Sequence, residues 1–340
     1  MSTPNTVLAN MNFTVPPSDG SPLYIDLGLA AKGTVPHKNA VEETKQVEIE
    51  NVRGEEGEYT LDQHGFQFFK SATSVESFTD SERVKREYYP EVQKVLRDVT
   101  GAGRIVIFDH TIRQRAASGV DGNLTKQQPA SLAHIDQTPA ASIARVHQNI
   151  PAAEVPVLLK KRFQLINLWR PITNIALDWP LAVCDYQSVD LERDVMPLKL
   201  IRPGQEDGET FAVRFNGGQR WKYLRGMERD EGVLLKCYDS AEGVATYTPH
   251  TAFSDPSTPK DAPYRARLRL GRYCSTIERA CSVLLDWCVY NAERRSSCGS
   301  ALFYTLLTCL LAVFVRLHMI FGVALYVASW RFQHHSYMLR

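Results

Sequence analysis

Two histidines and one aspartate have the residue types and spacing of a metal site. His134 and Asp136 are separated by a single isoleucine. On a β-strand, side chains at positions i and i+2 lie on the same face, so this imidazole and this carboxylate can approach one point. His250, in the run TPHT, offers a third ligand from a distant part of the chain. Two histidines and one carboxylate on one face of an ion form the facial triad of non-haem Fe(II) oxygenases.

The residues alone also allow an interpretation without a metal. The chain contains 9 His residues, so a His-x-Asp triplet can arise by chance. A histidine in a partly apolar run is commonly a hydrogen-bonded structural residue instead of a ligand. The neighbouring pair Asp109-His110 is a weaker candidate, because adjacent residues of a strand lie on opposite faces and cannot chelate one ion.

Three arginines are candidates for binding an anionic co-substrate. Arg265 begins an alternating run, RARLRL, and the planar guanidinium group pairs bidentately with a carboxylate. The same alternation also allows Arg265, Arg267 and Arg269 to form a solvated strand face, with the apolar residues between them on the core side. Arg170 lies between a tryptophan and a proline. It can stack on the ring, reach a substrate or co-substrate carboxylate, or bond backbone carbonyls as a structural arginine.

Short apolar runs must position these residues. From residue 163 onward, runs such as FQLINLW, LAVCDY, ETFAVRF and GVLLKCYD alternate with turn residues, and no long helix separates them. This pattern predicts an antiparallel sheet system and favours a sandwich or barrel over a doubly wound fold. Helical spacing predicts helices over 80–99 and within 139–163. Residues 1–45, with many Pro, Gly and Asn residues, are interpreted as an irregular N-terminal arm.

The composition is that of an ordinary globular protein. The chain has 340 residues, 39 Lys+Arg against 38 Asp+Glu, and a hydrophobic content of 44%. This charge balance excludes a protein that binds nucleic acid through a large overall excess of positive charge. No glycine-rich phosphate loop follows a predicted strand, and the seven cysteines include no CxxC pair. The N-terminal residues have neither a basic start nor an apolar run, so no secretory signal is predicted and a cytoplasmic location is expected.

Several motifs occur together and in a fixed order. They are FDHTIR at 108–113, AHIDQ at 133–137, NLWRP at 167–171, DWPLA at 178–182, CDY at 184–186, KCYDS at 236–240 and TPHTAF at 248–253. In type and order these motifs resemble the fungal AsaB-type hydroxylase/desaturase family, which is related to cephalosporin-methoxylase-like and gibberellin-desaturase-like proteins. So many ordered motifs make a chance resemblance a poor explanation.

The resemblance implies a mainly β fold with flanking helices, built on a jelly-roll (double-stranded β-helix) core over 46–272. It implies an oxidoreductase that uses Fe(II), 2-oxoglutarate and O2 to hydroxylate or desaturate a small molecule of fungal secondary metabolism. Arg265 falls where the family has an Arg-x-Ser that binds 2-oxoglutarate, and Arg267 replaces the serine. Two alternatives stay open: a non-catalytic, metabolite-binding member of the family, and group transfer such as methoxylation or methylation. The iron ligands implied by the resemblance are His134, Asp136 and His250.

Residues 273–340 differ from the rest of the chain and match nothing in that family. The run at 301–315 is uninterrupted and apolar, and a second apolar run follows Arg316 at 319–330. We interpret this segment as an atypical helical, hydrophobic tail, with membrane contact through 301–330 as one expectation. A buried amphipathic helix is an alternative, and so is a tail that comes from a retained intron or a shifted reading frame.

Overall fold

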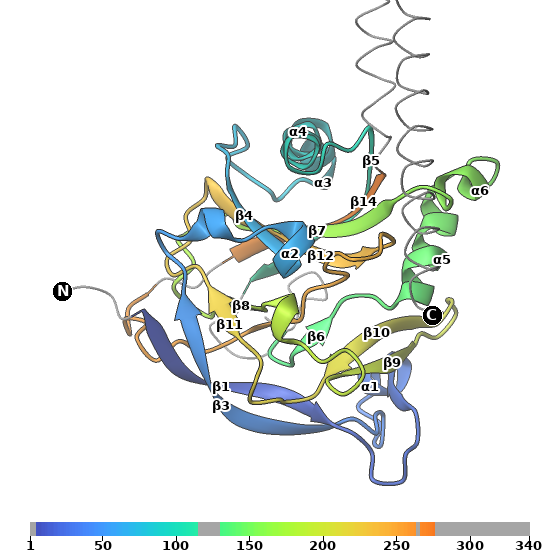
Figure 1. Ribbon diagram of the computed structural model, residues 1–340, viewed down its shortest axis with the longest axis vertical. Helices are drawn as coiled ribbons and strands as arrows, with labels where there is room; N and C mark the ends of the chain where they lie inside the picture. Colours follow the sequence, from blue (N-terminus) through green and yellow to red (C-terminus); the bar gives the residue numbers. More distant parts are fainter. Residues whose placement is uncertain (1–4, 115–129, 263–265, 276–340) are drawn as a thin grey trace, which may run out of the picture. The chain divides into compact units, whose positions relative to one another are not determined.

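The computed structural model describes residues 5–114, 130–262 and 266–275, and within these ranges two β-sheets face each other (Figure 1). The larger sheet has the strand order β1-β3-β11-β8-β13-β6-β10-β9-β2, and the smaller has the order β4-β12-β7-β14-β5. The strands of the larger sheet are β1 (Thr6–Val15), β2 (Leu23–Asp26), β3 (Val41–Asn51), β6 (His134–Ile135), β8 (Leu181–Cys184), β9 (Val195–Ile201), β10 (Gly208–Val213), β11 (Trp221–Tyr223) and β13 (His250–Ala252). Those of the smaller sheet are β4 (Phe66–Lys70), β5 (Arg104–Gln114), β7 (Phe163–Pro171), β12 (Glu231–Asp239) and β14 (Ala266–Ser275).

The two sheets pack together through one apolar core. Leu181 and Val183 of β8 lie in the same buried cluster as Trp169 of β7 and Val233 and Leu235 of β12. Every residue of β7 is buried, which explains why its sequence does not alternate between polar and apolar residues. Two facing sheets with mostly antiparallel pairing are the arrangement predicted for a jelly-roll core.

A helical layer covers the outer face of the smaller sheet (Figure 1). Val92 and Leu96 of this layer pack in one cluster with Ile166 and Leu168 of β7. Asp80 caps the start of the layer by accepting hydrogen bonds from two backbone N–H groups. The helix predicted over 80–99 is present as α3 (Ser81–Arg83), a π-helical turn (Val84–Tyr88) and α4 (Tyr89–Thr100).

Two shorter helices replace the helical stretch predicted within 139–163. Val146 and Ile150 pack in one cluster with Leu165 of β7 and Cys237 of β12, so this helical pair lies beside these two neighbouring strands of the smaller sheet. The pair is α5 (Pro139–Asn149) and α6 (Val155–Leu158), and the other helical elements are α1 (Leu27–Ala31), α2 (Leu61–His64) and 3-10 turns at Glu56–Glu58 and Tyr186–Ser188.

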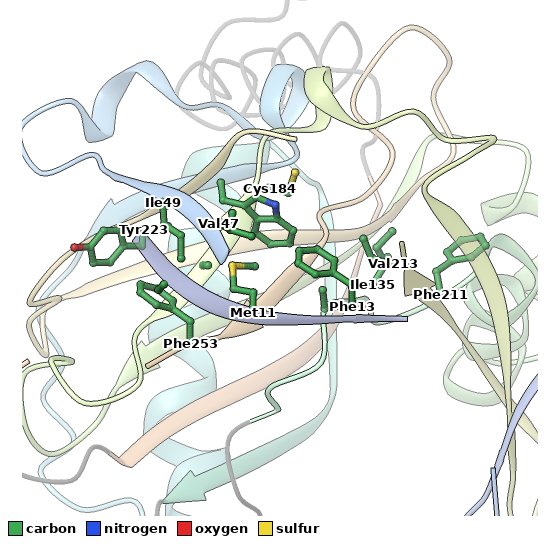
Figure 2. Close-up of a cluster of buried hydrophobic side chains, with 14 of the residues drawn as sticks. Met11, Phe13, Val47, Ile49, Ile135, Cys184, Phe211, Val213, Tyr223 and Phe253 are labelled. Carbon is green, nitrogen blue, oxygen red and sulfur yellow. The ribbon is translucent and has the colours of Figure 1, made fainter. Parts of the chain in front are cut away.

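The prediction of an irregular arm over 1–45 is wrong for the described residues. Strand β1 pairs with β3 along its whole length, from Thr6 opposite Glu50 to Val15 opposite Val41. Its side chains alternate between exposed and buried, and Phe13 is fully buried in the core of the larger sheet. Figure 2 shows Phe13 and its neighbours on β1 lying against side chains from the other strands of this sheet. The two-residue period of VLANMNF carries this strand signal.

The predicted boundaries of the jelly-roll domain are too narrow at both ends. Strand β1 lies before residue 46, and β14 continues to Ser275, past the boundary predicted at 272. Residues 276–340 lie outside the described part of the chain, so the predicted hydrophobic tail and its membrane contact stay predictions. Among the residues that the structure describes, no helix has the length and apolar character needed to cross a membrane.

Candidate active site

Strand pairing brings the two predicted histidine ligands together. His134 on β6 is the cross-strand partner of His250 on β13. Directly opposite residues of an antiparallel pair project from the same face of a sheet, so both imidazoles lie on one side. Their ring centroids are 4.4 Å apart, with an angle of 51° between the planes.

Asp136 completes the cluster from the bend immediately after β6. One carboxylate oxygen, Oδ1, is 3.6 Å from His134 Nε2, and the other, Oδ2, is 3.6 Å from His250 Nε2. One candidate ligand atom from each of the three residues lies within 4.8 Å of the other two. Metal–ligand bonds of about 2.1 Å place two ligands of one ion roughly 3 to 4 Å apart, so this spacing suits a single ion.

Backbone carbonyl groups set the tautomer of both histidines. His134 Nδ1 lies 2.8 Å from the carbonyl oxygen of Leu132, and His250 Nδ1 lies 3.0 Å from that of Thr248. A carbonyl oxygen can only accept, so each Nδ1 carries a hydrogen, and in the neutral imidazole the Nε2 atom near Asp136 is the one with the lone pair. Such a hydrogen bond on the second ring nitrogen is typical of metal-ligating histidines. The donor set therefore fits Fe(II).

The facing sheet supplies two further contacts to Asp136 that sequence reasoning missed. Asn167 Nδ2, on β7, donates a hydrogen bond to Asp136 Oδ2. The thiol of Cys237, on β12, lies 3.8 Å from the same oxygen. The available sequence signal was an amide in the apolar run FQLINLW, since a buried polar side chain requires a partner. The partner itself could not be read from the sequence.

Comparison with known proteins identifies the family. A family model described as an oxidoreductase/YMDC permease-like domain matches residues 11–269. The hydroxylase/desaturase efuI of Hormonema carpetanum is 34% identical over 269 residues, which cover 73% of this chain and 88% of that protein. The hydroxylase/desaturase CTB9 of Cercospora beticola is 31% identical over 264 residues, which cover 72% and 80%. The chain belongs to this fungal hydroxylase/desaturase family.

A solved structure of a family member confirms the fold. The iron and alpha-ketoglutarate-dependent endoperoxidase NvfI superimposes with a TM-score of 0.73 and 28% sequence identity, covering 81% of this chain and 99% of that one. The family, the oxidoreductase class and the jelly-roll fold that the sequence predicted are thereby confirmed. The names of these relatives also agree with the predicted cofactors, Fe(II) and 2-oxoglutarate.

The structure does not bring Arg170 to the histidines. It lies three positions after Asn167 on β7 and therefore on the opposite face of the strand. Its buried guanidinium donates to the Tyr88 hydroxyl at 3.1 Å and to the carbonyl oxygen of Ser71, and it lies 5.6 Å from the centre of the Phe69 ring. These contacts correct the expectation that Arg170 binds the co-substrate and favour the alternative of a structural arginine.

The other two predicted arginines are only partly within the described structure. Arg265 lies outside the described residues. Arg267 is on β14, where its Cα is opposite Pro171 of β7 and Arg113 of β5. Its side chain is outside the description, so the two predicted roles, a solvated strand face and a co-substrate contact, both stay predictions for these arginines.

Proposed function

We propose that this chain uses Fe(II), 2-oxoglutarate and O2 to hydroxylate or desaturate a small-molecule metabolite, with His134, Asp136 and His250 as the iron ligands. The observation that carries the proposal is the convergence of two histidine Nε2 atoms, each with its tautomer set by a backbone carbonyl, on one carboxylate. The names of relatives support the cofactors, because nvfI of Aspergillus novofumigatus is named as an Fe(II)/2-oxoglutarate-dependent dioxygenase.

When bound, the iron supplies the oxidation chemistry: 2-oxoglutarate and O2 are consumed, succinate and CO2 are released, and hydrogen is removed from the substrate. The protein provides ligand geometry and a site from which water is largely excluded. The side chains of His250 and Asp136 are 6% and 9% exposed, whereas that of His134 is 21% exposed. We therefore place the entrance for the substrate on the His134 side.

The decisive experiment replaces Asp136 and measures succinate release and metal binding together. In Asp136→Ala only two neutral imidazoles remain, so affinity for a hard divalent ion should fall by at least 100-fold, and Fe(II)-dependent succinate release should be lost. Asp98→Ala is a matched control, because Asp98 lies exposed on α4 and pairs only with Lys94 among its described contacts. Wild-type succinate release by Asp136→Ala would refute the proposed ligand set.

Neither alternative to an oxygenase gains support from this geometry. A non-catalytic binding protein has no need of two histidines whose Nε2 atoms face one carboxylate. A group-transfer enzyme has no need of that arrangement either. Succinate production that requires both Fe(II) and 2-oxoglutarate separates the oxygenase from both alternatives, and product analysis then distinguishes hydroxylation from desaturation.

For the co-substrate, we propose that Arg265 pairs with the distal carboxylate of 2-oxoglutarate. Removal of one charge-assisted pair costs about 1.5 to 3 kcal/mol, roughly 10- to 150-fold in affinity. Arg265→Ala should therefore raise the KM for 2-oxoglutarate by that factor and change the KM for the organic substrate much less. Equal changes in both constants would instead indicate a structural arginine, and Arg267→Ala would then be tested in the same way.

A further inference from the structure

The two histidines do not determine which oxygen of Asp136 faces the ion. Oδ1 is as close to His134 Nε2 as Oδ2 is to His250 Nε2, at 3.6 Å in each case. With only these neighbours, the carboxylate could bind a metal through either oxygen or through both. A selection between the oxygens must come from other contacts.

The contacts that distinguish the two oxygens come from the facing sheet. Asn167 Nδ2 donates to Oδ2, and the Cys237 thiol is directed at the same atom from 3.8 Å. The single S–H of Cys237 has a second acceptor, the carbonyl oxygen of Leu235 at 3.9 Å, so the amide of Asn167 is the stronger of the two contacts. This amide limits the rotation of the Asp136 carboxylate about its Cβ–Cγ bond.

We propose that Asn167 is a positioning residue that fixes the orientation of the Asp136 carboxylate toward the metal, with Cys237 as a weaker second contact. This inference rests on the proposed iron site. A carboxylate that is already held in one orientation would lose less freedom when it binds an ion, which favours metal affinity. The residue deepens the proposed function because it links the second sheet to the affinity of the metal site.

The backbone around Asn167 is well suited to this task. Strand β7 is hydrogen-bonded on both sides, with Asn167 opposite Leu235 of β12 and Gly271 of β14. A strand that is paired on both edges holds its side chains at a fixed height above the sheet. The Asn167 residue is only 5% exposed, so its amide lacks a competing interaction with bulk water.

The same strand offers a matched control. Gln164 is also a buried amide on β7, 3% exposed, but it lies on the outer face and donates to Asp239 at 2.7 Å. Loss of either amide removes one buried hydrogen bond to a carboxylate. Only the loss of Asn167 should change the metal site.

The experiment compares Asn167→Ala, Asn167→Leu and Gln164→Ala with the wild type, using Co(II) as the probe. Binding is measured by calorimetry, and the visible absorption of bound Co(II) with saturating 2-oxoglutarate reports the coordination. We expect both Asn167 variants to bind Co(II) about 10- to 100-fold more weakly, the range for loss of a hydrogen bond to a metal ligand, and to show an altered spectrum. Asn167→Leu keeps a similar volume and separates the lost donor from a cavity.

The outcomes are distinguishable. If the wild type does not bind Co(II), the proposed iron site fails. If the wild type and Gln164→Ala bind Co(II) alike, and both Asn167 variants match them in affinity and spectrum, the iron site stands and the positioning role is overturned. A loss of affinity in Gln164→Ala equal to that of the Asn167 variants would also overturn it, because the effect would then be a general consequence of destabilising β7.

Discussion

The two faces of strand β7 use buried polar side chains in different ways. On the inner face, Asn167 reaches across to the other sheet and donates to Asp136. On the outer face, Gln164 and Arg170 find their partners within the smaller sheet and the segments that cover it. The inner polar group thus contacts a carboxylate that we propose as an iron ligand, whereas the outer ones complete local networks.

The outer network contains two fully buried charges of opposite sign. The side chains of Lys236 and Asp239, both on β12, are 0% exposed, and their charged atoms are 2.5 Å apart. Arg162 bridges Asp239 at 2.7 Å and Asp62 at 2.5 Å, and Lys236 also reaches Asp62 at 2.8 Å. Burial by itself would raise the pKa of Asp239, but the hydrogen bonds and charges of Arg162 and Lys236 outweigh it and lower this pKa below its usual value.

This difference teaches that a polar residue in an apolar strand does not by itself indicate a functional site. The outer charges already have partners of opposite sign, so the cluster is electrically complete without a ligand. The group on the inner face has two imidazoles and a carboxylate whose candidate metal-binding atoms lie within 4.8 Å of one another, which is the proposed iron site. Changes on the outer face should therefore reduce stability, and changes on the inner face should reduce metal affinity.

The largest effect that tests this comparison is expected for Lys236→Met. Removal of one member of a buried ion pair costs about 3 to 5 kcal/mol, and we expect the lower end, about 3 kcal/mol, because Arg162 still pairs with Asp239. The measurement is the free energy of unfolding in urea. Lys94→Met, at an exposed pair with Asp98, is the control and should change it by less than about 0.5 kcal/mol. A loss below about 1 kcal/mol for Lys236→Met would contradict the assigned stabilising role.

A smaller effect is expected in the acid dependence of stability. Because the pKa of Asp239 is lower in the folded state, its contribution is complete above the unfolded value of about 3.9 and is lost as the pH falls through the folded value. In Asp239→Asn the free energy of unfolding should therefore fall less steeply below about pH 4 than in the wild type. The slope should decrease by up to one proton, which corresponds to about 1.4 kcal/mol per pH unit. An acid slope identical to that of the wild type would show that Asp239 does not titrate in this way.

The smallest effect is expected at Cys237, which contacts Asp136 only as a weak thiol donor. Cys237→Ala should weaken metal binding by less than about 10-fold, below the effect of Asn167→Ala. Cys184→Ala is the matched control, because Cys184 is also a buried thiol, on β8, but its sulfur lies near the carbonyl oxygen of Asp185 and the hydroxyl of Ser188 instead of Asp136. Both variants should lose similar stability, and equal metal affinity in the two would remove Cys237 from the site.

Much of the fold could be predicted because local patterns carry it. The apolar runs after residue 163 became strands, and the helical spacing at 80–99 became the layer that covers the smaller sheet. The N-terminal strand was missed although its two-residue alternation is present, because the neighbouring prolines and glycines dominated the interpretation. The division into two facing sheets depends on pairing between distant segments, which no local pattern specifies.

The candidate site also has some features that the sequence predicts and others that depend on the tertiary structure. From the sequence came the shared face of His134 and Asp136, because that relation needs only the period of one strand. The sequence also offered His250 as a third ligand from a distant segment, and the family resemblance supported that choice. Tertiary structure then made His250 the cross-strand partner of His134 and brought Asn167 from the facing sheet to Asp136. It also directed Arg170 away from the site. The role of a strand side chain depends on which element covers its face of the strand, and this is decided only when distant parts of the chain pack together.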